Sequence, residues 1–129
     1  MNKATIWVAD WEMQCCGKPF KVGDCVKWEI TKCEDDFLPF GSTCKIDYRY
    51  EGHDQGEHLY EISGIVTKIQ LVHTLYEQDS EDEQMYRPVS YKISNFNGEA
   101  DGWEKDIDKF LFRAYLVQLD YENDLITIR

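Results

Sequence analysis

The sequence predicts an all-β fold: a small SH3-like or OB-like barrel of about six strands with one short helix. Apolar and polar residues alternate along most of the chain, and one segment alone has helical spacing. The length of 129 residues is that of one domain, so we expect a single β-barrel domain over 1–129. Closing the strands into a barrel is the simplest way to hide their edges.

The first three predicted strands lie between residues 5 and 72. The run 5–9 is rich in β-branched and aromatic residues. Val26, Trp28 and Ile30 alternate with polar residues, which is the period of a strand buried on one face. In the run 65–72 the alternation assigns Ile65 and Ile69 to one common face.

The C-terminal half contains the remaining predicted strands. Alternation predicts strands over 89–94 and 115–121. After Asn123 and Asp124 the β-rich run 125–128 begins, so we expect it to form a hairpin with 115–121.

The single helical pattern predicts a short helix over 102–111. Asp101 and Glu104 have the spacing of a capping box at its start. Four apolar residues follow at spacings of one helical face: Trp103, Ile107, Phe110 and Leu111.

The charge of the chain restricts its partners. Lys and Arg number 14 and Asp and Glu 25, giving a net charge of -11. Many of the acidic residues lie in three predicted loops, 34–36, 51–58 and 77–83. Such a field repels phosphate backbones and anionic lipids, so we expect no nucleic acid and no membrane as partners, and a basic protein fits better.

The cysteines and the hydropathy indicate a cytoplasmic protein. Five cysteines is an odd number, and a disulfide between the adjacent Cys15 and Cys16 would close a strained ring. No stretch approaches the roughly 20 apolar residues of a spanning helix, and no leader is evident.

An N-terminal motif carries a resemblance. The chain reads W-x-x-D-W-x-x-x-C-C-G from Trp7 to Gly17, followed by Phe20-x-Val22-Gly23-Asp24-x-Val26-x-Trp28. This pattern resembles an uncharacterised family of small bacterial proteins, a domain of unknown function. The resemblance implies a bacterial cytosolic origin and supplies no activity.

The same N-terminal segment is the predicted functional surface. Its residues do not follow the alternation of a buried strand, and a purely structural turn would use other residue types. The segment therefore packs either against its own barrel or against a partner. The candidate binding residues are Asp10, Trp11, Gln14, Cys15, Cys16 and Gly17.

A soft-metal or thiol-redox site is an alternative. The chain has no C-x(2-4)-C pair of the kind that holds structural zinc, so we expect no metal and no cofactor. In the plainer reading Cys15 and Cys16 lie in a turn, one buried and one partly exposed, and His73 is a hydrogen-bonded core residue. The residues that could supply zinc ligands are Cys15, Cys16, Cys25, Cys33, Cys44, His53 and His58.

Aromatic density is the remaining feature. Exposed rings on a small barrel form a platform for a base, a sugar or a peptide, whereas buried rings only pack. The tryptophans in question are Trp7, Trp11, Trp28 and Trp103.

No catalytic signature occurs in the chain. The motifs of nucleophile-elbow hydrolases, P-loop and dinucleotide-binding proteins and zincins are absent. We therefore predict a non-catalytic β-barrel binding or interaction module. The alternatives are a zinc or thiol-redox protein using Cys15 and Cys16 with loop histidines, and an acidic inhibitor or immunity-type protein for a basic partner.

Overall fold

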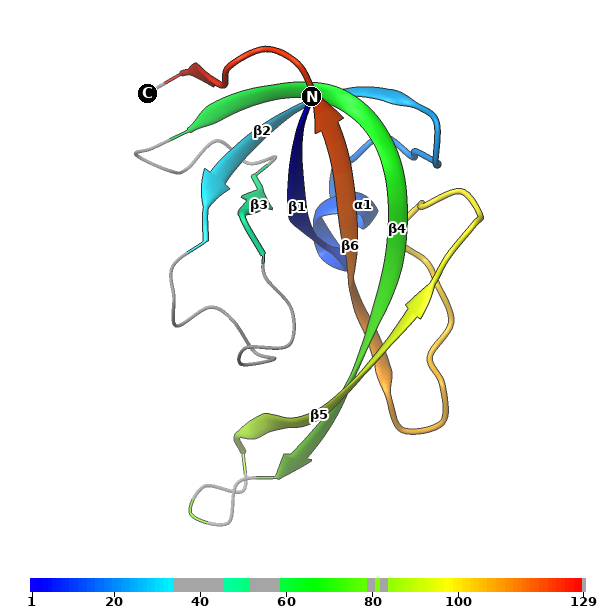
Figure 1. Ribbon diagram of the computed structural model, residues 1–129. Coiled ribbons are helices and arrows are strands. Elements are labelled where there is room, and N and C mark those ends of the chain that lie inside the picture. The colour runs from blue at the N-terminus through cyan, green and yellow to red at the C-terminus, as the bar shows by residue number, and fades with distance from the viewer. Residues whose placement is uncertain (34–45, 52–58, 79–80, 82–83, 129) are drawn as a thin grey trace.

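The computed structural model describes residues 1–33, 46–51, 59–78, 81 and 84–128 (Figure 1). The described part contains seven strands and one short helix. In chain order they are β1 (Asn2–Ala9), α1 (Asp10–Cys15), β2 (Cys25–Lys32), β3 (Tyr48–Tyr50), β4 (Tyr60–Gln78), β5 (Tyr86–Asn95), β6 (Leu111–Tyr121) and β7 (Ile126–Thr127).

Five of the strands close into a ring. β1 pairs antiparallel with β6 and parallel with β3, and β3 pairs antiparallel with β2. β2 and β6 both pair antiparallel with β4, which completes the circle. The predicted all-β class is confirmed.

Strand β4 is the longest element, with 19 residues, and it belongs to two parts of the molecule. Its first part lies in the ring beside β2, and its second part pairs with β5. Figure 1 shows β4 curving around the ring and then twisting with β5 into an arm that extends away from the ring.

The predicted face of β4 is wrong at its start. Ile65 is 42% exposed, whereas its neighbour Val66 is buried. The reason is a β-bulge: Val66 pairs with Leu119 and Lys68 with Gln118, which leaves Thr67 as an extra residue. An extra residue shifts the alternation, so the buried side changes along the strand.

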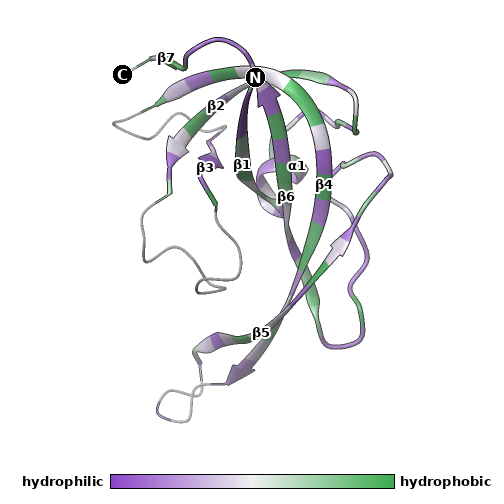
Figure 2. Ribbon diagram, viewed as in Figure 1, coloured by the Kyte–Doolittle hydropathy of each residue, from purple (hydrophilic) through white to green (hydrophobic). Residues whose placement is uncertain are grey.

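The main core lies inside the ring. Buried and less buried residues alternate along β1, whereas in β6 the four residues 114–117 are all buried. Figure 2 shows the hydropathy of the residues as green and purple bands along these strands. Gly64 lets β4 cross β6 closely, since a Cβ there would lie 2.5 Å from the carbonyl oxygen of Asp120. Fully buried members of this core include Ile6, Val8, Ile30, Val66, Tyr115, Val117 and Leu119.

The predicted helix over 102–111 is wrong. Gly102 has φ +92° and Asp108 has φ 52°, neither of which is helical. Ile107 and Phe110 exchange backbone hydrogen bonds of 2.9 and 2.8 Å across a tight turn. Trp103 and Ile107 are exposed, so the apolar spacing does not mark a buried helix face.

The predicted C-terminal hairpin is also wrong. β7 pairs with the start of β4, through Tyr60 with Thr127 and Glu61 with Ile126. Both edges of β6 are already occupied by β1 and β4, so no edge remains for a hairpin partner. The strand β4 continues two residues into the predicted loop 77–83, because Glu77 and Gln78 still pair with β5. The predicted loop residues 34–36 and 52–58 lie outside the described residues.

Candidate functional site

The predicted functional segment forms α1 and its C-terminal end: Cys15 is the last residue of the helix, and Cys16 lies in the turn that precedes Gly17. Ala9 is extended, with φ -66° and ψ 146°, and the helix begins at Asp10. Glu12 and Met13 are the buried residues of this helix. The backbone N–H groups of Cys16 and Gly17 both donate to the carbonyl of Glu12, at 3.1 and 2.9 Å, and end the helix.

Gly17 fits where no other residue would. A Cβ at this position would lie 2.5 Å from the sulfur of Met13 and 2.9 Å from its Cα. The chain therefore turns tightly against the helix that it has just left, and this places Cys16 beside the helix end.

Cys15 and Cys16 have adjacent thiols. Their sulfur atoms are 2.7 Å apart, and both residues are exposed, so the expectation that one of them is buried is wrong. The hydrogen bond with Cys15 raises the pKa of the Cys16 thiol above its ordinary value, and desolvation raises it further.

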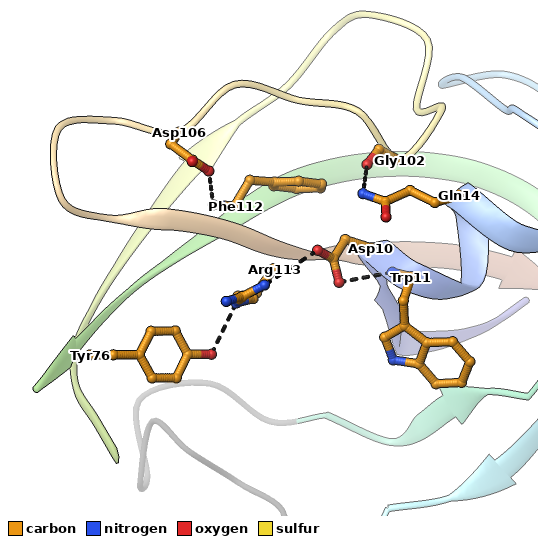
Figure 3. A network of polar contacts seen from close by, with 8 residues as sticks. All are labelled: Asp10, Trp11, Gln14, Tyr76, Gly102, Asp106, Phe112 and Arg113. Atoms are coloured by element: carbon orange, nitrogen blue, oxygen red, sulfur yellow. Dashed lines mark hydrogen bonds and ion pairs between the residues drawn. The ribbon is translucent and has the colours of Figure 1, made fainter. Parts of the chain in front are cut away.

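The segment 99–110 is fastened to α1. The side-chain amide of Gln14 donates to the carbonyl of Gly102 at 2.7 Å (Figure 3). At Gly102 a Cβ would lie 2.8 Å from the Cβ of Met13, so only glycine permits this approach. The hydroxyl of Tyr115, a core residue, makes two hydrogen bonds to the segment 99–110. It accepts from the Gly102 N–H at 2.9 Å and donates to Glu104 at 2.6 Å. Burial, and then the bond to Glu104, raise the pKa of Tyr115.

The four tryptophans have different environments. Trp28 is buried in the ring, and Trp7 is partly buried against a second small apolar cluster. Trp11 is 54% exposed and Trp103 is 69% exposed. Two of the four tryptophans are thus exposed, as an aromatic platform requires: Trp11 on α1 and Trp103 on the segment 99–110.

Asp10 links α1 to the arm through Arg113 and Tyr76 (Figure 3). Its carboxylate accepts from the Trp11 N–H at 2.8 Å and lies 3.8 Å from a terminal nitrogen of Arg113. The Nε–H of Arg113 donates to the Tyr76 hydroxyl at 3.2 Å. Burial raises the pKa of Asp10, against the opposing effects of the Trp11 N–H and of Arg113.

Sequence reasoning missed Arg113, Tyr76 and the contribution of Trp103 to the site. Arg113 had a usable signal, because it is a charged residue inside the apolar run 111–117. A charged side chain in such a run needs contact with solvent or with polar partners, so it marks a position worth examining. Trp103 was assigned to a helix face that does not form.

The predicted alternatives have these positions. Cys44, His53 and His58 lie outside the described residues. Among the described residues, no group of three or more His, Cys, Asp or Glu side chains could hold a metal ion. His73, the one histidine among the described residues, is buried and donates through Nε2 to the Lys105 carbonyl at 2.9 Å, so its predicted core role is confirmed.

A family model matches residues 2–121, and its description is Family of unknown function (DUF6578). The chain belongs to the DUF6578 family. The match covers the elements from β1 to β6 and the candidate site of this DUF6578 protein, and it confirms the predicted membership in a family of unknown function. No curated protein and no solved structure matches the DUF6578 chain. None of its described helices is long and apolar enough to cross a membrane.

Proposed function

We propose that the protein is a non-catalytic interaction module that binds a basic protein partner. The binding region is the α1 surface, which we define as Asp10, Trp11, Gln14, Cys15, Cys16 and Gly17 together with the segment 99–110. A single observation carries the proposal: Trp11 and Trp103 are 54% and 69% exposed on two segments that are joined by the hydrogen bond between Gln14 and Gly102.

Exposed tryptophans are costly for a solitary protein and common at the centres of interfaces. Trp11 and Gln14 point to opposite sides of α1, and Gln14 binds the residue that precedes Trp103 (Figure 3). A helix with its side chains is about 10 Å wide, whereas one side of a standard interface covers about 800 Å². Trp11 and the segment that carries Trp103 therefore lie on different sides of α1, and we propose that one partner reaches around α1 to contact both tryptophans.

Part of this surface, the segment 99–110, is rich in carboxylates. The segment from Glu99 to Lys109 holds five acidic residues and two lysines. Glu99, Asp101, Asp106 and Asp108 are exposed there. Exposed carboxylates on the segment that carries Trp103 favour a basic partner, because complementary potentials accelerate association and select against acidic proteins.

We propose further that the ring is an OB-like barrel with circularly permuted strands. In an OB-fold the third of five strands runs parallel to the fifth, and a helix joins the third to the fourth. Read in the order β4, β6, β1, β2, β3, the present pairings have this arrangement, with α1 in the place of that helix. The parallel pair of β1 and β3 favours the OB-like over the SH3-like prediction, since SH3 neighbours are antiparallel.

This topology also bears on the ligand class. OB-folds bind oligonucleotides on the face of their second and third strands, which correspond here to β6 and β1. On that face Trp7 pairs with Leu116, and Leu116 is 3% exposed and Ala114 is buried completely. This face is largely apolar and covered around Leu116, and the net charge of -11 repels phosphates, so we propose a protein partner and no nucleic acid.

A thiol-redox function is the second candidate, favoured by the 2.7 Å approach of the exposed Cys15 and Cys16 sulfurs. Reduced exposed thiols persist in the cytoplasm, and we propose a bacterial cytoplasm as the location. In this reading the two thiols lose two hydrogens to glutathione disulfide, which becomes two molecules of glutathione. A loss of about 2 Da in the peptide that carries both cysteines would support it, and mixed disulfides alone would oppose it.

Site-specific photo-crosslinking tests the interaction module. Trp103 is replaced by p-benzoylphenylalanine in cells that carry the gene, and the same replacement at Ile126 is the control. Ile126 is 60% exposed on β7, away from α1. We expect an adduct with a basic protein from position 103 and none from position 126, weakening as salt rises from about 0.05 to 0.5 M. Equal adducts at both positions, or an acidic adduct, would contradict the proposal.

A further inference from the structure

A hollow lies at the base of the arm, apart from the two tryptophans. Its volume is ≈ 490 Å³, within the range of sites for small ligands. Among the described residues it is lined by Tyr76, Tyr86, Lys109, Leu111 and Arg113. Two cations without a carboxylate among these lining residues are an exception in a chain of net charge -11.

A β-bulge directs Arg113 toward this hollow. Val72 pairs with Ala114 and His73 with Phe112, so Arg113 is the extra residue on β6. Bulges re-aim side chains and are enriched next to functional sites. A second bulge lies on β5, the other neighbour of β4, because Leu75 pairs with Ser90 and Tyr76 with Pro88.

The Arg113 guanidinium is held in place before any ligand arrives. Its Nε–H donates to the Tyr76 hydroxyl at 3.2 Å, and its central carbon lies 5.2 Å from the Tyr76 ring centre. A cation that is already ordered loses little side-chain entropy when it binds an anion.

Donor groups remain for a ligand. The contact between Arg113 and Asp10 is 3.8 Å long, which is an ion pair but exceeds a hydrogen bond. A guanidinium has five N–H groups, and the bond to Tyr76 uses one of them. Lys109 is exposed beside it. Oxygens of one phosphate or carboxylate could therefore bind both cations.

The tyrosines define the rest of the ligand. Tyr76 and Tyr86 come from the paired strands β4 and β5, and Tyr86 is 64% exposed. Tyrosine rings stack on planar groups at small conformational cost. We propose that this hollow binds a small aromatic anion, with its phosphate or carboxylate oxygens on Lys109 and Arg113 and its ring against Tyr86.

An NMR titration at constant ionic strength tests this site on the whole chain. The probes are phenyl phosphate and benzoate, which carry both features, and inorganic phosphate and phenol, which carry one each. For a ligand of this size a Kd on the order of 1 mM is expected. We expect phenyl phosphate or benzoate to saturate and to shift the Nε–H signal of Arg113, and the stronger of the two identifies the acid group. Phenol or inorganic phosphate binding equally well would overturn the proposal.

Matched charge variants separate a site from general attraction. Lys109→Gln removes a lining cation, and Lys68→Gln removes an exposed cation of β4 that does not line the hollow. We expect K109Q to weaken the better probe about tenfold and K68Q to leave it within about twofold. Equal losses in both variants would overturn the site. A wild-type titration that shifts no signal of Tyr86, Lys109 or Arg113 would do so without any variant.

Discussion

The strand ring and the α1 surface use the same kinds of residues in opposite ways. In the ring, aromatic and branched residues are buried, with Trp28 packed edge-on against Phe20 and Tyr50. On the α1 surface Trp11 and Trp103 are exposed, although the backbone beneath them is fixed by short hydrogen bonds. The aromatic residues of the ring thus contribute to the core, whereas Trp11 and Trp103 contribute little to it, and this difference is what the proposed binding role explains.

Buried contacts between α1, Gly17 and the segment 99–110 hold the α1 surface together. Met13, Gly17 and Gly102 meet at distances that leave no room for an added Cβ. Tyr115, itself in the core, bridges Gly102 and Glu104. Packing therefore holds the segment 99–110 against α1 and leaves Trp11 and Trp103 exposed, as the proposed binding surface requires.

The largest effect on stability is expected within the ring. Leu119 is fully buried and pairs with Ala4 and Val66. Leu119→Ala should lower the free energy of unfolding by about 3 kcal/mol, because it leaves a cavity in a packed core. Urea unfolding measures this, and Ile126→Ala, at a 60% exposed position, is the control with an expected change below about 0.5 kcal/mol. Similar losses in both variants would break the distinction between core and surface.

A smaller loss of stability is expected for a substitution at Gly102, where the segment 99–110 packs against α1. Gly102→Ala should cost about 2 kcal/mol, because φ is +92° and the new Cβ would lie 2.8 Å from the Met13 Cβ. Hydrogen exchange should show faster opening of the segment 99–110 and unchanged protection in β1 and β6. Unchanged exchange in that segment would mean that Gly102 does not fasten it.

Cys33 gives a pH-dependent prediction with a still smaller effect. Burial raises the pKa of its thiol from 9.0 to about 11, with a smaller opposing effect of Arg49. The unfolded chain therefore releases this proton first, and the contribution is complete below pH 9.0 and lost as pH rises to about 11. Cys33 is partly exposed, so we expect a loss of at most about 1 kcal/mol relative to Cys33→Ala. An equal pH dependence in both proteins would contradict the assigned burial.

Local patterns predicted the strands well because alternation reports one buried face. Trp28 and Ile30 are buried as their spacing requires, and the run 115–121 lies within β6. The face of β4 failed at Ile65, because a bulge adds a residue that no local pattern reveals. The hairpin after Tyr121 failed because the pairing of β7 depends on which strand edges the whole sheet leaves open.

The candidate site was predicted as a segment but not as a surface. Asp10, Trp11 and Gln14 were selected because they break the strand pattern, and they do lie together on α1. Their partners Gly102 and Arg113 are remote in sequence and reach α1 through chain crossing and a bulge. Helical spacing at 102–111 was misleading, since the turns at Gly102 and Asp108 require left-handed backbone.

The central claim is that Trp11 and Trp103 serve binding and not folding. The most direct measurement compares the double variant Trp11→Ala, Trp103→Ala with wild type in two respects: the free energy of unfolding and the Kd for the protein captured by photo-crosslinking at position 103. We predict a change in stability below about 0.5 kcal/mol and a loss of affinity of at least about 100-fold, as expected for two aromatic anchors. An unchanged Kd, or a loss of stability as large as that of Leu119→Ala, would contradict the account.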